Sequence, residues 1–489
     1  MIGRPGSVKN DARGGEKFGA TGRDGTSQRI IVRVRTLTQR IHFIGIGGAG
    51  LSALAQVMLG RGFVVSGSDP AAPNRVTDYL EKRGATIFSE HEAGNIAGAD
   101  LIVTTSAARA DNPELVAAHL QQIPIFKRRE FLREVTRGYD VIAVAGSHGK
   151  TTTTAMIARI LEEAGLDPTA IVGGTVPEWD TNARVGTSRW FVIEADEYDY
   201  AFLGLEPKIA VLTNVDYDHP DLFPTRAAYR DAFEAFLKQT RMDGVCIVWG
   251  DDGAASELAQ RADQRVIRYG VGQENDWRVG NIAANALGGS DFSVFRNNHL
   301  LSNGSLQIPG THNVLNALAA IAAAQQANVS LDAALNTLKT FGGVARRFQV
   351  LGSFHGAVVV DDYAHHPTEI RATLSAARLR FPSARIFALF QPHTFSRTHA
   401  LMDEFADAFD DADVVLITEI YAARERDEAG LTSQEIVARM NRRAVQHVGS
   451  LEQAEEILRK ELRAGDVLIT LGAGNVNRVA QDLVGNKNA

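Results

Sequence analysis

Residues 146–151 carry the strongest chemical signal in the sequence. They read Gly-Ser-His-Gly-Lys-Thr and stand between an apolar run at 140–145 and a helix-like stretch that begins at 150. Backbone N–H groups of such a loop hold phosphates, its lysine reaches β and γ oxygens, and its threonine hydroxyl ligates Mg²⁺. Val144 replaces the usual first glycine. The predicted phosphate-binding residues here are Gly146, Ser147, His148, Gly149, Lys150, Thr151 and Thr152.

Two acidic clusters follow successive predicted strands. Glu194 and Asp196 come after the run 190–193, and Asp216, Asp218 and His219 come after 209–214. Ligands of open α/β sheets gather at the carboxyl ends of strands. Mg²⁺ prefers carboxylate, water and phosphate oxygens, and an imidazole can complete a second site. Together with the phosphate loop, these clusters predict a magnesium site, for which the candidate ligands are Thr151, Glu194 and His219.

A second glycine loop lies nearer the N-terminus. Residues 45–50 read GIGGAG, follow a predicted strand and open a predicted helix, and Asp69 ends the next strand. Such a loop lets backbone N–H groups approach a pyrophosphate, and an acid at the second strand's end can hold ribose hydroxyls. NAD and a UDP-sugar both carry these groups, so the loop alone leaves its ligand open.

The elements that must position these residues form three α/β units. Apolar strand-like runs alternate with helix-like stretches from residue 41 to the C-terminus, which is typical of parallel sheets. We predict domains at 41–139, 140–344 and 345–489, preceded by a disordered basic tail at 1–40. The segment 286–305 is rich in Gly, Asn and Ser and predicts β-turns within the middle unit.

Composition narrows the class of protein. The chain has 489 residues, a formal net charge of −7 and one cysteine, which excludes an internal disulfide. No apolar run approaches the length of a membrane span, so we expect a cytoplasmic protein with no membrane partner. Residues 1–40 hold nine basic and three acidic side chains, but these are scattered, and the rest of the chain is acidic. We therefore expect no nucleic-acid partner.

The motifs resemble those of a known family, the ATP-dependent amide ligases of peptidoglycan precursor synthesis, or Mur ligases. The stretches that carry the resemblance are IHFIGIGGAGLSALA, VSGSD, AVAGSHGKTTTT, IEADEYD, TNVDYDHPD, GTHNVLNALAA, GGVARRFQ, DDYAHHPTEIRATL, FQPHTFSRT and LITLGAG, and they run from about residue 41 to 474. The resemblance implies three domains, for a UDP substrate, for ATP, and for closing over the site. It also implies that ATP phosphorylates the lactyl carboxylate of UDP-N-acetylmuramate and that the amine of L-alanine attacks the acyl phosphate.

The resemblance also implies roles for individual residues. The predicted phosphate-binding residues 146–152 become ATP-binding residues under it. Lys150 would hold the γ-phosphate, Thr151 and Glu194 one Mg²⁺, and His219 a second. Asn313 and Asn316 would lie near the adenine. Arg346 or Arg347, and Asp361 or Asp362, would reach ATP from the closing side; we choose Arg346 and Asp361. The implied UDP-substrate residues are Gly45, Gly47, Gly48, Gly50, Ser52, Asp69 and Ser106.

The amino-acid side is implied by two motifs of the third unit. His365 would orient the alanine amine or accept its proton, and Arg397 would bind the alanine carboxylate, with Tyr363 and His393 in the same pocket. The implied catalytic set is therefore Lys150, His219, His365 and Arg397. Thr394 stands where family members often have Arg, which makes the choice of alanine over glycine or serine less firm.

Three alternatives remain open from the sequence. A recycling ligase that joins a preformed tripeptide to UDP-N-acetylmuramate shares EADEYD and AHHPT. A nicotinamide oxidoreductase explains residues 45–50 but leaves the phosphate loop unused. A non-catalytic nucleotide-binding module explains both glycine loops but has no use for His365 or Arg397. The sequence is compatible with a monomer or a homodimer.

Overall fold

The computed structural model describes residues 39–423, 425–426, 430–441 and 444–485 of the chain. The predicted tail therefore lies outside the described residues, apart from its last two positions. Arg40 already belongs to the first strand.

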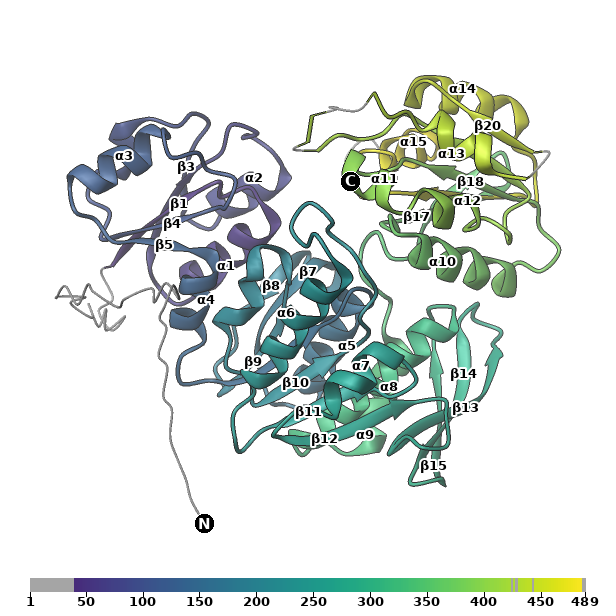
Figure 1. The fold of residues 1–489 in the computed structure, drawn as a ribbon, viewed down its shortest axis with the longest axis horizontal. Helices are drawn as coiled ribbons and strands as arrows, with labels where there is room; N and C mark the ends of the chain where they lie inside the picture. The colour runs from purple at the N-terminus through teal and green to yellow at the C-terminus, as the bar shows by residue number, and fades with distance from the viewer. Residues whose placement is uncertain (1–38, 424, 427–429, 442–443, 486–489) are drawn as a thin grey trace, which may run out of the picture. The chain divides into compact units, whose positions relative to one another are not determined.

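Three sheets follow one another along the described chain, each flanked by helices (Figure 1). The first is a five-stranded parallel sheet of order β3-β2-β1-β4-β5. Its strands are β1 (Arg40–Ile44), β2 (Val64–Ser68), β3 (Thr86–Phe88), β4 (Leu101–Thr104) and β5 (Ile125–Lys127), and its helices are α1 (Ala49–Gly60), α2 (Arg75–Glu81), α3 (Pro113–Leu120) and α4 (Arg128–Thr136), with a 3₁₀ turn η1 (Ala93–Ile96).

The second sheet has ten strands in the order β15-β14-β13-β12-β11-β10-β6-β9-β7-β8. Its strands are β6 (Asp140–Ala145), β7 (Thr169–Val176), β8 (Thr181–Arg184), β9 (Trp190–Glu194), β10 (Ile209–Leu212), β11 (Val245–Trp249), β12 (Arg265–Gly270), β13 (Trp277–Ala284), β14 (Ser290–Arg296) and β15 (His299–Leu306). Its helices are α5 (Lys150–Glu163), α6 (Arg226–Lys238), α7 (Gly253–Ala259), α8 (Thr311–Gln326) and α9 (Leu331–Thr340), with 3₁₀ segments η2 (Pro177–Trp179) and η3 (Tyr198–Gly204). The run from β13 to β7 is parallel, while β14, β15 and β8 are antiparallel additions. The segment 286–305, predicted as turns, is therefore largely strand.

The third sheet has the order β16-β17-β21-β18-β19-β20 and is parallel except for β16. Its strands are β16 (Gln349–Phe354), β17 (Ala357–Asp362), β18 (Ile386–Phe390), β19 (Val414–Ile417), β20 (Val445–His447) and β21 (Val467–Leu471), and its helices are α10 (Pro367–Arg380), α11 (Phe395–Ala400), α12 (Met402–Ala406), α13 (Gln434–Arg439), α14 (Leu451–Glu461) and α15 (Asn477–Leu483). The predicted α/β class with three domains is confirmed. We propose to keep the domain limits near 139 and 344, because no described sheet draws strands from both sides of either limit.

The order of the central sheet positions the predicted site. All residues of β6 and β10 are buried, as expected for strands covered on both faces, and β6 lies between β10 and β9. Their parallel alignment brings the loops after β6, β9 and β10 to one edge. The phosphate loop and both acidic clusters therefore meet there. Among the described residues, no helix is both long and apolar enough to cross a bilayer.

Candidate active site

The phosphate loop is held by the segment that follows β10. Thr213 donates from Oγ1 to the carbonyl of His148 at 2.6 Å, and Asn214 accepts the amides of Ser147 and His148 through its own oxygens. Gly146 (φ 132°) is required, because a Cβ there would lie 2.0 Å from Thr213 Oγ1. The amides of residues 147 and 148 are thus already paired. The first turn of α5 supplies the free amides that a helix N-terminus offers to phosphate.

Lys150 folds back over this loop. Its Nζ donates to the carbonyls of Gly146 and Ser147 and lies 3.0 Å from the Glu197 carboxylate. Burial alone would lower the pKa of Lys150, but the nearby carboxylates, Glu197 foremost, outweigh burial and raise it. The side chain is therefore a half-buried cation at the start of α5.

The predicted metal ligands form two neighbouring donor groups. Thr151 donates from Oγ1 to Glu194 Oε1 at 3.1 Å, and Gly173 N donates to the other oxygen of Glu194 at 2.7 Å. His219 Nε2 lies 3.8 Å from Glu197 Oε1 and 3.7 Å from Asp218 Oδ2. Glu197 Oε2 is buried and has no aligned hydrogen bond within the described chain, although it lies 3.0 Å from Lys150 Nζ. A hydroxyl, carboxylates and an imidazole at a phosphate loop are a donor set that fits Mg²⁺.

A cavity of about 260 Å³ collects groups from all three units. The central unit contributes Lys150, Thr151, Glu194, Glu197 and His219, the third unit contributes Tyr363, His365, His393 and Arg397, and the first unit contributes Ala49, Gly50 and Arg128. All four predicted catalytic residues therefore line one space. We refer to it as the reaction cavity.

A second cavity, of about 370 Å³, lies on the other side of Arg347 and Glu369, which line both cavities. It is lined by the predicted Asn313 and Asn316 of α8 and by the aromatic rings of Trp249 and Tyr269. A Cβ on Gly149 would lie 2.5 Å from Asn316 Oδ1, so the phosphate loop and α8 are in close contact. Aromatic faces with a few amides suit a nucleobase, and we refer to this space as the nucleotide cavity.

The two members of the pair Arg346 and Arg347, and those of the pair Asp361 and Asp362, have different surroundings in the structure. Arg346 donates to Asp361, to Gly472 O at 2.7 Å and to Gly474 O, and Asp361 also accepts from Thr470. These contacts lie inside the third unit, and neither Arg346 nor Asp361 lines a cavity described above. Arg347 lines both cavities and Asp362 lines the nucleotide cavity. Burial raises the pKa of Asp362 to about 6, partly offset by Arg347. We therefore propose Arg347 and Asp362, rather than Arg346 and Asp361, as the residues on the ATP side.

The predicted amino-acid pocket is built around Arg397, at the start of α11. Its Nε donates to Asp218 Oδ1 at 2.7 Å, and its Nη1 contacts His393 O at 3.3 Å. His365 contacts Tyr363 O through Nδ1 at 3.0 Å. Thr394 has a φ of 67°, a left-handed conformation that is strained for a β-branched residue.

In the first unit the glycine loop is braced by its own acid. Gly47 N donates to Asp69 Oδ2 at 2.9 Å, and Ala71 N donates to Asp69 Oδ1. Ser52 is buried and donates to Ala49 O, while Ser106 lies in an exposed turn. The carboxylate that we expected to hold ribose thus already has two backbone partners. The expected UDP-substrate residues remain proposals, of which Gly50 at the start of α1 reaches the reaction cavity.

Sequence reasoning missed several charged residues that line the cavities. Glu369 sits three residues after His366, where it closes a capping box at the start of α10, a pattern that the sequence does display. Arg128 donates to Asp196 Oδ2 at 2.6 Å and joins the first unit to the central one, and no local pattern marks it. His148 was recognised only as a loop residue, although its ring contacts two carboxylates.

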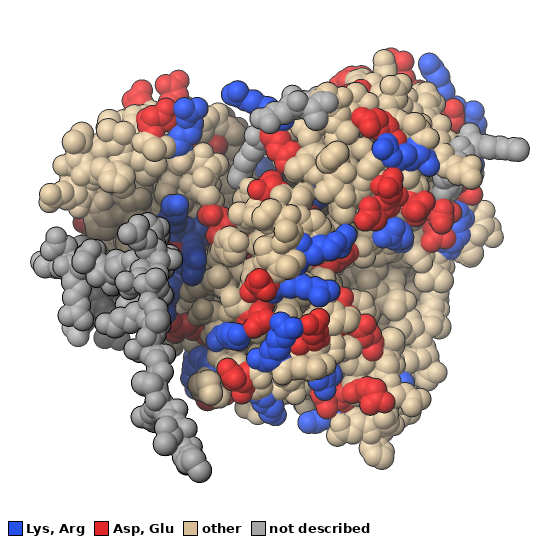
Figure 2. Space-filling model, in the orientation of Figure 1, with Lys and Arg blue, Asp and Glu red and all other residues tan. Residues whose placement is uncertain are grey.

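On the face shown in Figure 2, acidic and basic side chains are interspersed over the described residues. This face therefore offers no broad positive field to an anion, whereas Lys150, Arg397 and the α5 N-terminus supply local positive charge at the reaction cavity.

Family models match almost all of the described chain. The model described as Mur ligase family, catalytic domain, matches residues 40–140; the Mur ligase middle domain matches 144–324; and the model described as Mur ligase, glutamate ligase domain, matches 346–474.

Individual proteins agree with these models. The chain is 45% identical over 450 residues to the UDP-N-acetylmuramate–L-alanine ligase of Solibacter usitatus, which covers 91% of this chain and 95% of that protein. The crystal structure of the UDP-N-acetylmuramate-alanine ligase from Thermotoga maritima superposes with a TM-score of 0.78 at 31% identity, covering 91% of this chain and 98% of that one. A murein peptide ligase from Psychrobacter arcticus gives a TM-score of 0.68 at 27% identity, covering 92% and 99%. The chain belongs to the Mur ligase family of ATP-dependent ligases.

Proposed function

We propose that this enzyme joins L-alanine to the lactyl carboxylate of UDP-N-acetylmuramate, with ATP as the energy source and an acyl phosphate as the intermediate. The observation that carries the proposal is the reaction cavity. It brings the phosphate-loop Lys150, the C-terminal His365 and Arg397, and the glycine-loop residue Gly50 into one space. A phosphate donor, an amino acid and a UDP-linked carboxylate can meet only if all three units contribute. We also propose a cytoplasmic location, because ATP and UDP-linked sugars are cytoplasmic metabolites.

In the first step, the carboxylate of the UDP substrate attacks the γ-phosphate of ATP, and ADP leaves. Lys150 and the amides at the start of α5 would neutralise the charge on the transferred group, while Arg347 would contact the nucleotide from the third unit. Thr151, Glu194 and His219 would hold Mg²⁺. When bound, Mg²⁺ supplies positive charge to the phosphate oxygens and to the substrate carboxylate.

In the second step, the alanine amine attacks the acyl carbon, the bond from that carbon to the phosphate oxygen breaks, and the proton lost by the amine nitrogen leaves with the departing phosphate. Arg397 would bind the alanine carboxylate and His393 would border it. Burial, together with Arg397, lowers the pKa of His365 to about 3, although Glu369 opposes the shift. His365 is therefore neutral, and a proton on Nδ1 that is donated to Tyr363 O leaves Nε2 as an acceptor on a side chain that lines the reaction cavity. We assign His365 the task of orienting the amine, because so weak a base is poorly suited to removing its proton.

The proposal is tested by phosphate release and product mass with purified enzyme. Release should require ATP, Mg²⁺, UDP-N-acetylmuramate and L-alanine together, and the product should have the mass of the alanine amide. A panel with glycine, L-serine and the tripeptide L-Ala-γ-D-Glu-meso-diaminopimelate should give the highest kcat/KM for alanine. Preference for the tripeptide would assign the chain to peptide recycling instead. Full-rate phosphate release without any amino acid would contradict the ligase proposal.

A further inference from the structure

The side chain of His148 is not needed to hold the phosphate loop. Its backbone N–H donates to Asn214 Oδ1 at 2.9 Å, and its carbonyl accepts from Thr213 Oγ1 and Asn214 Nδ2. These three bonds fix the loop through the main chain. The imidazole is therefore available for another task, and its surroundings show which one.

The imidazole lies between carboxylates from two different sheets. Nε2 lies 3.2 Å from Asp216 Oδ2, which follows β10 of the central sheet. Nδ1 lies 3.3 Å from Glu369 Oε1 in α10 of the third unit, an ion-pair contact without hydrogen-bond alignment. The side chain is 13% exposed. Facing a carboxylate at each ring nitrogen, the ring is stabilised as the doubly protonated imidazolium, because a neutral imidazole carries only one N–H.

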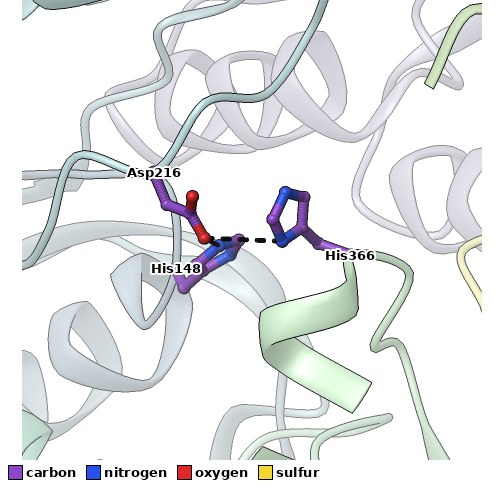
Figure 3. Close-up of side chains that lie close together, drawn as sticks. All are labelled: His148, Asp216 and His366. Carbon is purple, nitrogen blue, oxygen red and sulfur yellow. Dashed lines mark hydrogen bonds and ion pairs between the residues drawn. The ribbon is translucent and has the colours of Figure 1, made fainter. Parts of the chain in front are cut away.

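The first turn of α10 reinforces this junction. Thr368 donates from Oγ1 to Asp216 Oδ2 at 2.6 Å, and the His366 ring lies 4.6 Å from the His148 ring (Figure 3). Glu369 Oε2 accepts the amides of His365 and His366, while its Oε1 faces His148. The backbone that carries His365 into the reaction cavity is thus fixed by the same carboxylate that contacts the phosphate loop.

We propose that His148 is a positioning residue, which couples docking of the C-terminal unit to the phosphate loop through the Asp216–His148–Glu369 bridge. The proposal rests on the ATP site proposed above. It adds the side chain that links docking of the third unit to the phosphate loop of that site. The bridge lines the nucleotide cavity, where His148 offsets two carboxylates that would otherwise repel ATP. When the third unit docks, Glu369 reaches His148 and His365 is placed beside the γ-phosphate by one movement.

A metal ion is the competing explanation for the same side chains. One ligand atom each from His148, Asp216 and His366 lie within 4.8 Å of one another. However, Asp216 Oδ2 already accepts from Thr368, and Nδ1 of His366 accepts the amide of Thr368 at 3.3 Å. Hydrogen bonds from Thr368 therefore already engage the Asp216 and His366 atoms without an ion, and a metal becomes one outcome of the test.

The experiment compares His148→Gln, Glu369→Gln and the double variant, with His299→Gln on the exposed face of β15 as the matched control. Gln at 148 leaves the backbone bonds of the loop intact, and Gln at 369 still accepts the amides of His365 and His366. Each single variant should lower kcat/KM for ATP by roughly 10- to 100-fold, the range expected for a lost charged contact. The kcat/KM of the double variant should be no more than about twofold below that of the less active single variant, because the two substitutions remove the same bridge.

Two readouts separate coupling from a structural role. Small-angle scattering should show that the wild type compacts on adding a non-hydrolysable ATP analogue with UDP-N-acetylmuramate, whereas both single variants compact less although each still unfolds cooperatively, well above the temperature of the measurement. Multiplying effects in the double variant, or full compaction of the variants, would overturn the proposal. Activity lost with 1,10-phenanthroline in excess Mg²⁺ and restored by Zn²⁺ would overturn it in favour of a metal site. If the wild type forms no amide product, the proposed function fails instead, whereas an active wild type with additive variants refutes only the bridge.

Discussion

Arg397 and Asp218 form a buried ion pair between the third unit and the central unit. Nε of Arg397 donates to Oδ1 of Asp218 at 2.7 Å, and the two side chains are only 4% and 5% exposed. Burial would raise the pKa of Asp218, but Arg397 outweighs it and holds this pKa well below its usual value. Once the third unit is docked, the guanidinium is therefore held in a fixed orientation with its Nε edge engaged. Preorganisation of this kind lowers the cost of binding a carboxylate.

Replacing Arg397 by Ala should chiefly raise the KM for alanine. The lost charged contact is expected to cost about 1.5–3 kcal/mol, or roughly 10- to 100-fold. The KM for ATP should change little, since Arg397 does not line the nucleotide cavity. Initial rates at varied alanine give the result, with Arg371→Ala on the exposed face of α10 as the matched control. An unchanged alanine KM would refute this role.

Replacing Lys150 by Ala should abolish ligation while leaving UDP-substrate binding intact. Nζ is the cation of the phosphate loop, and its removal also leaves the buried Glu197 without its partner. We expect kcat to fall at least about 10²–10³-fold, as for loss of a preorganised group that stabilises transition-state charge. Calorimetry with UDP-N-acetylmuramate checks binding, and Lys460→Ala in α14 controls for charge loss. Retained turnover would mean that the loop is not the ATP site.

Replacing Glu194 by Gln should increase the Mg²⁺ concentration needed for half-maximal rate. Gln keeps the size of the side chain and can still accept from Thr151, but it lacks the charge that a hard cation requires. The measurement is phosphate release against Mg²⁺ concentration in a chelator-buffered series. Glu178→Gln, at an exposed position in the same domain, should leave the curve unmoved. The same curve in both variants would exclude Glu194 as a ligand.

Arg346 and Arg347 should differ when each is replaced by Ala. Arg347→Ala should raise the KM for ATP, because its side chain borders both cavities. Arg346→Ala should mainly lower the melting temperature, because it removes bonds to Asp361 and to the backbone near β21. Kinetics and thermal unfolding of both proteins decide the matter. The reverse assignment of effects would restore Arg346 as the nucleotide residue.

These two arginines illustrate what could be predicted from the sequence and what could not. The α/β class and the three units followed from strand-like runs such as 140–145, which are fully buried as expected. The phosphate loop was recognisable because its spacing is local. Which of two adjacent arginines lines a cavity depends on the local backbone conformation, and here Arg346 has a φ of 60° while Arg347 lines both cavities. That backbone angle is set by tertiary contacts and leaves no trace in residue type.

Long-range partners were equally invisible. Arg397 and Asp218 are separated by 179 positions, and His148 and Glu369 belong to different motifs. The residue types of a motif indicate what that motif can bind, but they do not show which residues of a distant motif it contacts. The strands at 290–296 and 299–306 were also missed, because their Gly, Asn and Ser content favours turns and only the antiparallel pairing of β14 with β13 and of β15 with β14 makes them strands.

The charge on His148 should make stability depend on pH in a specific window. Burial would lower the pKa of His148, but its contacts with Asp216 and Glu369 raise it to about 9. Two neighbouring groups do not change protonation in this window: His366, whose pKa burial lowers to about 4, stays neutral, and Arg347, which contacts Glu369, stays cationic. A group whose pKa is raised on folding stabilises fully below its unfolded pKa of about 6.5 and loses that contribution as pH rises through about 9.

The free energy of unfolding should therefore fall between pH 6.5 and 9.5 by up to about 3 kcal/mol more in the wild type than in His148→Gln. Urea unfolding at a series of pH values measures this difference, followed by fluorescence of Trp249 and the other tryptophans. His299→Gln should keep the wild-type slope, because its ring is exposed. Equal slopes in the wild type and His148→Gln would show that the ring is neutral in the folded protein, and would remove the charge that the bridge to Glu369 requires.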